Sequence, residues 1–100
     1  MAFLPVVAAT GAVDLLPAVA GQTIVVEAIY LVSGGAVTLT FQSVVPGSAA
    51  TNITGPMVFA TPFIMNVDGT QMGLFATASG GGLRMTGGSA TSGFIRYSLR

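Results

Sequence analysis

The apolar positions of this chain fall into short runs in which apolar and polar residues alternate. In AVTLTFQS, residues 36–43, Val37, Leu39 and Phe41 share one face of an extended chain, and the polar residues between them share the other. The closing stretch GFIRYSLR, residues 93–100, alternates in the same way. A period of two is typical of a half-buried β-strand. These two segments therefore predict strands with one face on a core.

Turn-forming residues separate the apolar runs. Glycine, in most cases with proline, serine, threonine or aspartate beside it, occurs at residues 10–11, 20–21, 33–35, 46–48, 54–56, 68–69, 79–82 and 87–89. Short strands with turn signals at this spacing predict an all-β sandwich or barrel. The expected strands are residues 3–9, 12–16, 23–32, 36–42, 57–60, 63–67, 73–77 continued by 83–85, and 94–99.

The segment 22–32 differs because both of its faces are apolar. One face carries Ile24, Val26, Ala28, Tyr30 and Val32, and the other carries Thr23, Val25, Glu27, Ile29 and Leu31. A strand that is apolar on both faces is buried on both faces. In a chain of 100 residues the second face is expected to meet another subunit. The alternative is a strand that bends across the edge of the sandwich and contributes to both ends of one core.

Charge is scarce. Only six residues are charged, the formal net charge is zero, and 52% of the chain is hydrophobic. An ordinary soluble domain is about 25% charged. Six charges are few for the surface of a small domain, so we expect other subunits to cover part of it. The zero net charge gives no field to attract nucleic acid or a membrane surface.

Glu27 is the one charge within the most apolar predicted strand. A buried carboxylate needs a partner, and Arg84 or Arg96 is the natural one, within or between subunits. The alternative is an edge position at which Glu27 reaches water and blunts strand-to-strand aggregation. The residues predicted for a subunit or shell interface are Val25, Glu27, Ile29, Leu31, Arg84 and Arg96.

The first sixteen residues are apolar, but Pro5 and Gly11 interrupt them. They lack the basic start of a signal peptide, and no apolar run is long enough for a membrane-spanning helix. Residues 1–16 are therefore predicted to form an N-terminal arm or the first strands, and residues 17–100 the β-sandwich domain. As an arm, this segment would dock on a neighbour through Phe3, Leu4, Val6 and Val7.

The inventory of reactive side chains is nearly empty. The chain has no His, Cys or Lys, and its three acids are dispersed. Neither a metal site, nor a Schiff base, nor a His-activated serine can be assembled from these residues. Asp68-Gly69 is expected to be a turn between strands, because the other ligands of a calcium loop are missing. We therefore expect no enzyme, and no metal or cofactor.

A set of small motifs between residues 35 and 99 resembles a known group. The stretches are GGAVTLTFQS, NITGPM, GLFATASGGGL and SGFIRYSL. The matching positions are Phe41, Ser43, Ile53, Gly55, Gly73, Phe75, Thr77, Gly80, Leu83, Gly93 and Tyr97. Leu74 stands where the group has an aromatic residue, and Gly81-Gly82 where it has a more polar pair. With these positions the chain resembles small structural proteins of tailed-bacteriophage virions.

The resemblance implies a fold and a role. The fold would be an antiparallel, jelly-roll-like β-sandwich of about eight short strands. The role would be that of a capsid decoration or cement protein on the virion surface, a homotrimer bound to the major capsid protein or to another virion protein. The alternative is a head- or tail-fibre module that binds a host receptor or glycan.

Overall fold

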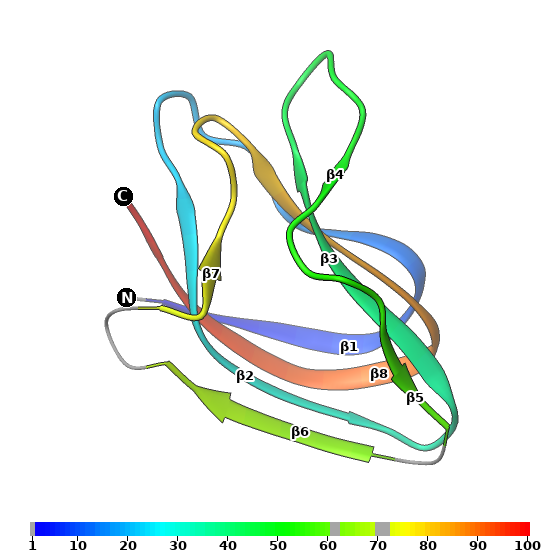
Figure 1. The fold of residues 1–100 in the computed structure, drawn as a ribbon. Coiled ribbons are helices and arrows are strands. Elements are labelled where there is room, and N and C mark those ends of the chain that lie inside the picture. The colour runs from blue at the N-terminus through cyan, green and yellow to red at the C-terminus, as the bar shows by residue number, and fades with distance from the viewer. Residues whose placement is uncertain (1, 61–62, 70–72) are drawn as a thin grey trace.

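The structure is a computed structural model that describes residues 2–60, 63–69 and 73–100. Within these residues the regular elements are all strands (Figure 1). They are β1 (Ala2–Leu16), β2 (Ile24–Ser33), β3 (Val37–Val44), β4 (Thr51–Asn52), β5 (Met57–Phe59), β6 (Phe63–Asp68), β7 (Phe75–Ala76) and β8 (Gly82–Leu99). The described part of the chain holds no helix of the length and apolarity needed to cross a membrane.

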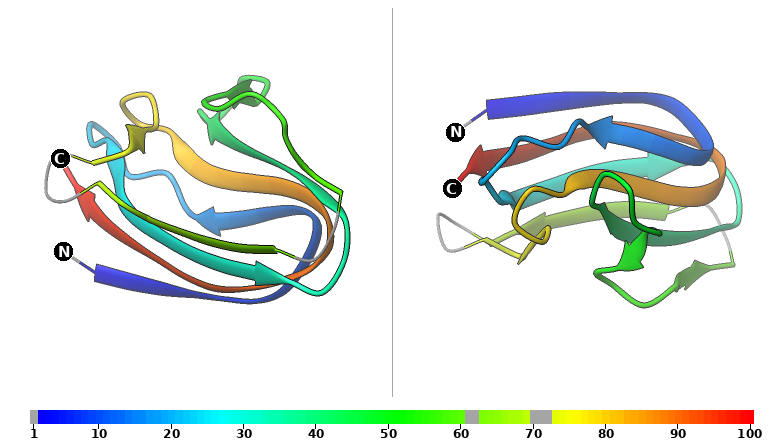
Figure 2. Two further views of the ribbon diagram at one scale, coloured as in Figure 1. Left: turned by 60° about the horizontal axis from the view of Figure 1, so that its bottom comes forward. Right: turned by 90° about the horizontal axis from the view of Figure 1, so that it is seen from above.

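Two antiparallel sheets share their longest strands. In the first sheet, the N-terminal half of β1 pairs with the C-terminal half of β8, β8 pairs with β2, and β6 and β7 both lie along the far edge of β2. In the second sheet, the other halves of β1 and β8 pair with each other, β8 pairs with β3, and β4 and β5 follow. Figure 2 shows β1 and β8 curving from one layer into the other.

The curvature has a local cause in the pairing of β1 with β8. The register shifts twice between the pair Val6–Gly93 and the pair Gly11–Gly87. An irregular register bends a strand and increases its twist. Gly11 has a φ of 65°, which a residue without Cβ adopts at no steric cost. The two halves of each long strand can therefore belong to different layers.

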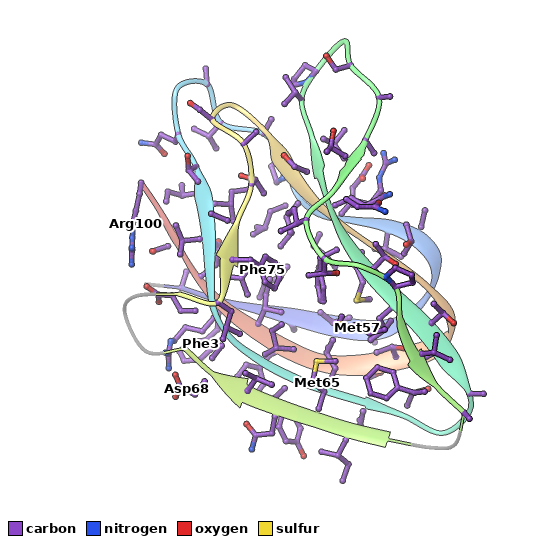
Figure 3. The ribbon with its side chains drawn as sticks, viewed as in Figure 1. Phe3, Met57, Met65, Asp68, Phe75 and Arg100 are labelled. Atoms are coloured by element: carbon purple, nitrogen blue, oxygen red, sulfur yellow. The ribbon has the colours of Figure 1, made fainter. Side chains whose placement is uncertain are left out.

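The core fills the space between the sheets. Its fully enclosed members come from β1, β2, β3 and β8: Val6, Ile24, Val26, Ile29, Leu31, Val37, Leu39, Phe41, Leu83, Met85 and Ile95. The rings of Phe41 and Phe75 lie 5.1 Å apart. Met57, Met65 and Phe75 point into this space from the shorter strands and pack against the core (Figure 3).

The predicted all-β sandwich of antiparallel strands is confirmed. Four of the eight predicted strands, at residues 23–32, 36–42, 57–60 and 63–67, agree with the observed ones to within two residues, but three predictions of length are wrong. The segments 3–9 and 12–16 form one strand, β1. The segments 83–85 and 94–99 belong to one strand of 18 residues, β8, and the predicted strand at 73–77 shortens to the two residues of β7. The short strand β4 was not predicted.

Candidate interaction surface

A β-bulge at Glu27 decides which side chains of β2 face the core. The register between β2 and β8 shifts by one residue between Val26 and Ala28. Before the bulge, Ile24 and Val26 point inward; after it, Ile29 and Leu31 do. Ile29 and Leu31, which the sequence predicted for a contact surface, belong to the core of this chain instead. Val25 is also buried, so this part of the interface prediction is wrong.

The outer face of the first sheet carries a row of three aromatic rings from three adjacent strands. Phe94 of β8 lies at its centre. Its ring stacks on Tyr30 of β2 at 5.7 Å and meets Phe3 of β1 edge-on, also at 5.7 Å. All three side chains are exposed, and Phe3 keeps 63% of its accessible surface. An exposed row of aromatic rings marks a surface suited to a partner.

Exposed aliphatic side chains extend this aromatic row. Ile64 of β6 lies opposite Val32 in the register, two residues along from the pair Tyr30–Asn66, and is 71% exposed. Val7 is exposed on β1. We call the surface formed by Phe3, Val7, Tyr30, Ile64 and Phe94 the outer apolar face. It crosses all four principal strands of the first sheet.

An ion network borders the outer apolar face. Arg96 bridges two acids: its Nε lies 3.5 Å from Glu27 Oε1, and one terminal nitrogen donates to Asp68 at 2.9 Å. Arg100 donates to Glu27 Oε2 at 3.0 Å, and the Ser98 hydroxyl donates to the same oxygen at 3.1 Å. The bulge allows this arrangement, because it turns Glu27 toward the outer face of β8. Glu27 is thus buried and paired within its own chain. Asp68 and Arg100 lie on the side of the molecule where both termini lie (Figures 1 and 3).

Arg84 does not join this network. It lies on the second sheet, and its Nε donates to Asp14 Oδ1 at 2.7 Å. The hydrogen bond from Arg84 holds the pKa of the Asp14 carboxyl below its usual value, and raises the pKa of Arg84 in return. Of the two partners that the sequence offered for Glu27, Arg96 is correct and Arg84 is wrong. Each of the six charged residues is therefore ion-paired within the chain.

The predicted N-terminal arm is a strand of the sandwich. β1 pairs with β8 along both of its halves, from Ala2–Tyr97 to Leu16–Leu83. Val6 is buried in the core and Leu4 packs against it, so these two cannot dock on a neighbour. Only Phe3 and Val7 of the four predicted contact residues are exposed. An apolar segment interrupted by Pro5 is accommodated here as an edge strand.

Tyr30, Phe94 and Ile64 were not predicted as surface residues. The sequence did indicate that Phe94 is exposed. In an extended strand Phe94 shares a face with the polar residues Arg96 and Ser98, and Ile95 lies on the opposite face. Tyr30 could not be assigned to the outside without knowledge of the bulge, since it appeared to share a face with Ile24 and Val26. Nothing in the sequence indicated how β6 pairs with β2, so the position of Ile64 could not be predicted.

Hollows lined by described residues also lie away from the outer apolar face. One, of about 530 Å³, is lined by residues 36–38, 58–60 and Gly87, none of which is ionisable. Another, of about 340 Å³, includes Asp14, whose carboxylate already accepts from Arg84. Within the described residues, no three side chains among His, Cys, Asp and Glu gather to hold a metal. The outer apolar face is therefore the strongest candidate for a functional surface.

Comparison with protein-family models, with curated proteins and with solved structures finds no match for this chain.

Proposed function

We propose that this chain is a structural virion protein, a capsid decoration or cement protein that binds the assembled phage shell and stabilises it. The outer apolar face is the attachment surface, and the exposed row Phe3–Phe94–Tyr30 is the observation that carries the proposal. The resemblance to small virion proteins supplies the class of partner.

The character of the surface supports attachment by apolar burial. The chain exposes 5051 Å², close to the roughly 5200 Å² expected of a compact protein of its mass. The chain has only six charged residues for a surface of this size, and each of them is ion-paired within the chain. Burial of apolar area stabilises association by about 25 cal/mol per Å² before the costs of binding. Aromatic side chains are enriched among the residues that dominate such contacts.

Repetition fits a stabilising role. A shell offers many identical sites, so each contact can be modest while the decorated particle becomes stiffer. Binding to the shell should depend little on salt concentration. The charged residues are already paired within the chain, so few charges remain to attract the partner, and salt weakens only such charge–charge attraction.

The test compares virions of the encoding phage that carry or lack this protein. Decorated particles should release their genome at a higher temperature than bare ones. Phe94→Ala and Phe3→Ala should each weaken binding to bare particles at least about tenfold. Val58→Ala, which alters an exposed residue on β5 of the other sheet, is the matched control and should bind normally. Equal release curves for decorated and bare particles would refute a cement role.

A fibre module that binds a host glycan is the second candidate. Its support is the stacked pair Tyr30–Phe94, next to the polar side chain of Asn66 in the register. Aromatic faces beside amides are surfaces on which sugars can bind. In this case Phe94→Ala would abolish binding to host cells while leaving the heat stability of the particle unchanged.

A further inference from the structure

The edge strands of the two sheets differ in how they are protected. Among the described strands, β1, β4, β5, β6 and β7 each pair with one neighbour only. An open edge offers backbone groups to another chain unless a proline, a charge, a bulge or shortness blocks it. β4, β5 and β7 are two or three residues long, and β1 contains Pro5 and register shifts. β6 has six residues, FIMNVD, with no proline and one charge, at its last position.

The hydrogen-bond pattern shows which groups of β6 face its open edge. The Gly69 N–H donates to the Glu27 carbonyl at 2.7 Å, one step beyond the pair Ala28–Asp68. In an antiparallel ladder the residues that bond to the neighbour alternate. Val67 and Met65 therefore bond to β2, whereas Ile64 and Asn66 direct their N–H and C=O groups away from it. The open edge of β6 thus presents a backbone ladder.

We propose that this edge pairs with a second copy of the chain, antiparallel to itself, about a two-fold axis at Asn66. This register is self-complementary. The Asn66 carboxamide lies beside that of the second copy, and an amide both donates and accepts. Asp68 lies opposite Ile64 of the second copy, so the two carboxylates stay apart.

The same register covers an exposed apolar side chain. Val67 lies on the core side of the sheet, opposite the buried Ile29, yet it is 42% exposed. In the proposed pair, Met65 of the second copy lies opposite Val67 on that side. The first sheets of the two copies become one, and the outer apolar face continues through Ile64 across the axis.

The result is a dimer rather than the trimer that the family resemblance implies, and two-fold pairs are the commonest closed oligomers. The pairing forms through the backbone edge of β6 and shares only Ile64 with the outer apolar face, and its test is the oligomeric state, so its failure is distinguishable from failure of the shell-binding proposal.

Single cysteines can test the register directly, because the natural chain has none. Residues opposite each other in a sheet lie about 4.5–5.5 Å apart, within the range of a disulfide. Asn66→Cys should form a disulfide-linked dimer on mild oxidation, at least about tenfold faster than Val58→Cys, an exposed cysteine on the short strand β5. Met65→Cys and Val67→Cys should each remain uncrosslinked alone but crosslink to each other when mixed. Equal rates for Asn66→Cys and Val58→Cys, or no crosslink in the mixture, would overturn the register.

Sedimentation of the native chain tests the pairing itself, with a dimer expected. Asn66→Pro removes an N–H that faces the open edge, just as Pro5 lacks one on β1, and should yield a monomer with an unchanged circular-dichroism spectrum. Should that variant fail to fold, Ile64→Lys places a charge at an exposed position of the same edge and should also yield a monomer. A native monomer, a native trimer, or a folded variant that remains dimeric would each refute the proposal.

Discussion

Glu27 Oε1 and Arg96 Nε lie 3.5 Å apart, and both atoms are buried without a hydrogen-bond partner among the described residues. The Glu27 side chain is only 4% exposed. Its other oxygen is better satisfied, since it accepts from Ser98 and Arg100. A carboxylate this deep is tolerated because two guanidinium groups face it. The bulge that places Glu27 there also determines which later side chains of β2 face the core. Charge pairing and core packing therefore depend on the same short segment.

Removal of one partner from this buried pair should be costly. We expect Arg96→Met to lower the free energy of unfolding by about 3 kcal/mol, because it leaves Glu27 buried with Arg100 alone. The double variant Glu27→Leu with Arg96→Met should recover most of the loss, because it buries no unmatched charge. Urea unfolding of the three proteins measures both effects. Arg84→Met is the control for the loss of an arginine, and its exposed ion pair should contribute far less. A double variant less stable than Arg96→Met would contradict this account.

Gly93 should tolerate no side chain. It lies opposite Leu31 of β2, with a φ of 146°, and a Cβ there would collide with the Tyr30 carbonyl. Gly93→Ala should therefore destabilise the fold by at least about 3 kcal/mol, because backbone on both strands would have to move. Gly34→Ala is the matched control, since no atom lies within 4 Å of the point that a Cβ at this residue would occupy. Thermal unfolding followed by circular dichroism distinguishes the two, and equal midpoints would show that the strands can separate here without loss.

Alternation of apolar and polar residues was enough to find β3 and the C-terminal part of β8. The run around Leu39 and Phe41 alternates without interruption, and both residues are fully buried in β3. Ile95 of the closing strand, which alternates with Phe94 and Arg96, is likewise fully buried. These positions follow from local sequence, because side chains of a regular strand point alternately to its two faces.

The bulge and the bends were beyond such reasoning. One extra residue at Glu27 moves every later side chain of β2 to the opposite face, so Ile29 and Leu31 were assigned to the wrong surface. In β8, the stretch TGGSATSG, residues 86–93, has the composition of a turn, yet it continues as a strand because neighbouring strands pair with it. Both features depend on partners distant in the sequence, and no local pattern records them.

The N-terminal segment should behave as part of the core. Val6→Ala removes two buried methyl groups and should lower the free energy of unfolding by about 2 kcal/mol. Phe3→Ala, three residues away on the exposed face, should change it by less than about 1 kcal/mol. Deletion of residues 1–9 should prevent folding, because β8 would lose one of its two neighbours in the first sheet and the core would lose Val6. Urea unfolding and far-ultraviolet circular dichroism report these outcomes. A deletion variant with a native spectrum would restore the interpretation of this segment as a detachable arm.

The ion pair between Asp14 and Arg84 should make stability depend on pH in the acid range. The hydrogen bond from Arg84 lowers the pKa of Asp14 in the folded protein below the value of about 3.9 that it has in an unfolded chain. The unfolded state therefore binds the proton more readily, and stability falls as the pH drops. The contribution of the pair is complete above the unfolded pKa and disappears as the pH falls through the lower folded value. Asp14→Asn removes this dependence, so native and variant proteins should differ most near neutral pH and converge as the pH falls through the lowered folded pKa of Asp14. Urea midpoints across that pH range measure the difference in stability between native and variant proteins. Arg84→Gln should show the same difference from the native protein, because it removes the cause of the pKa shift.

High salt should reduce this difference in stability, since both groups lie at the surface. A gap that widened in acid would have the wrong sign for a lowered carboxyl pKa and would reject the pair as its source.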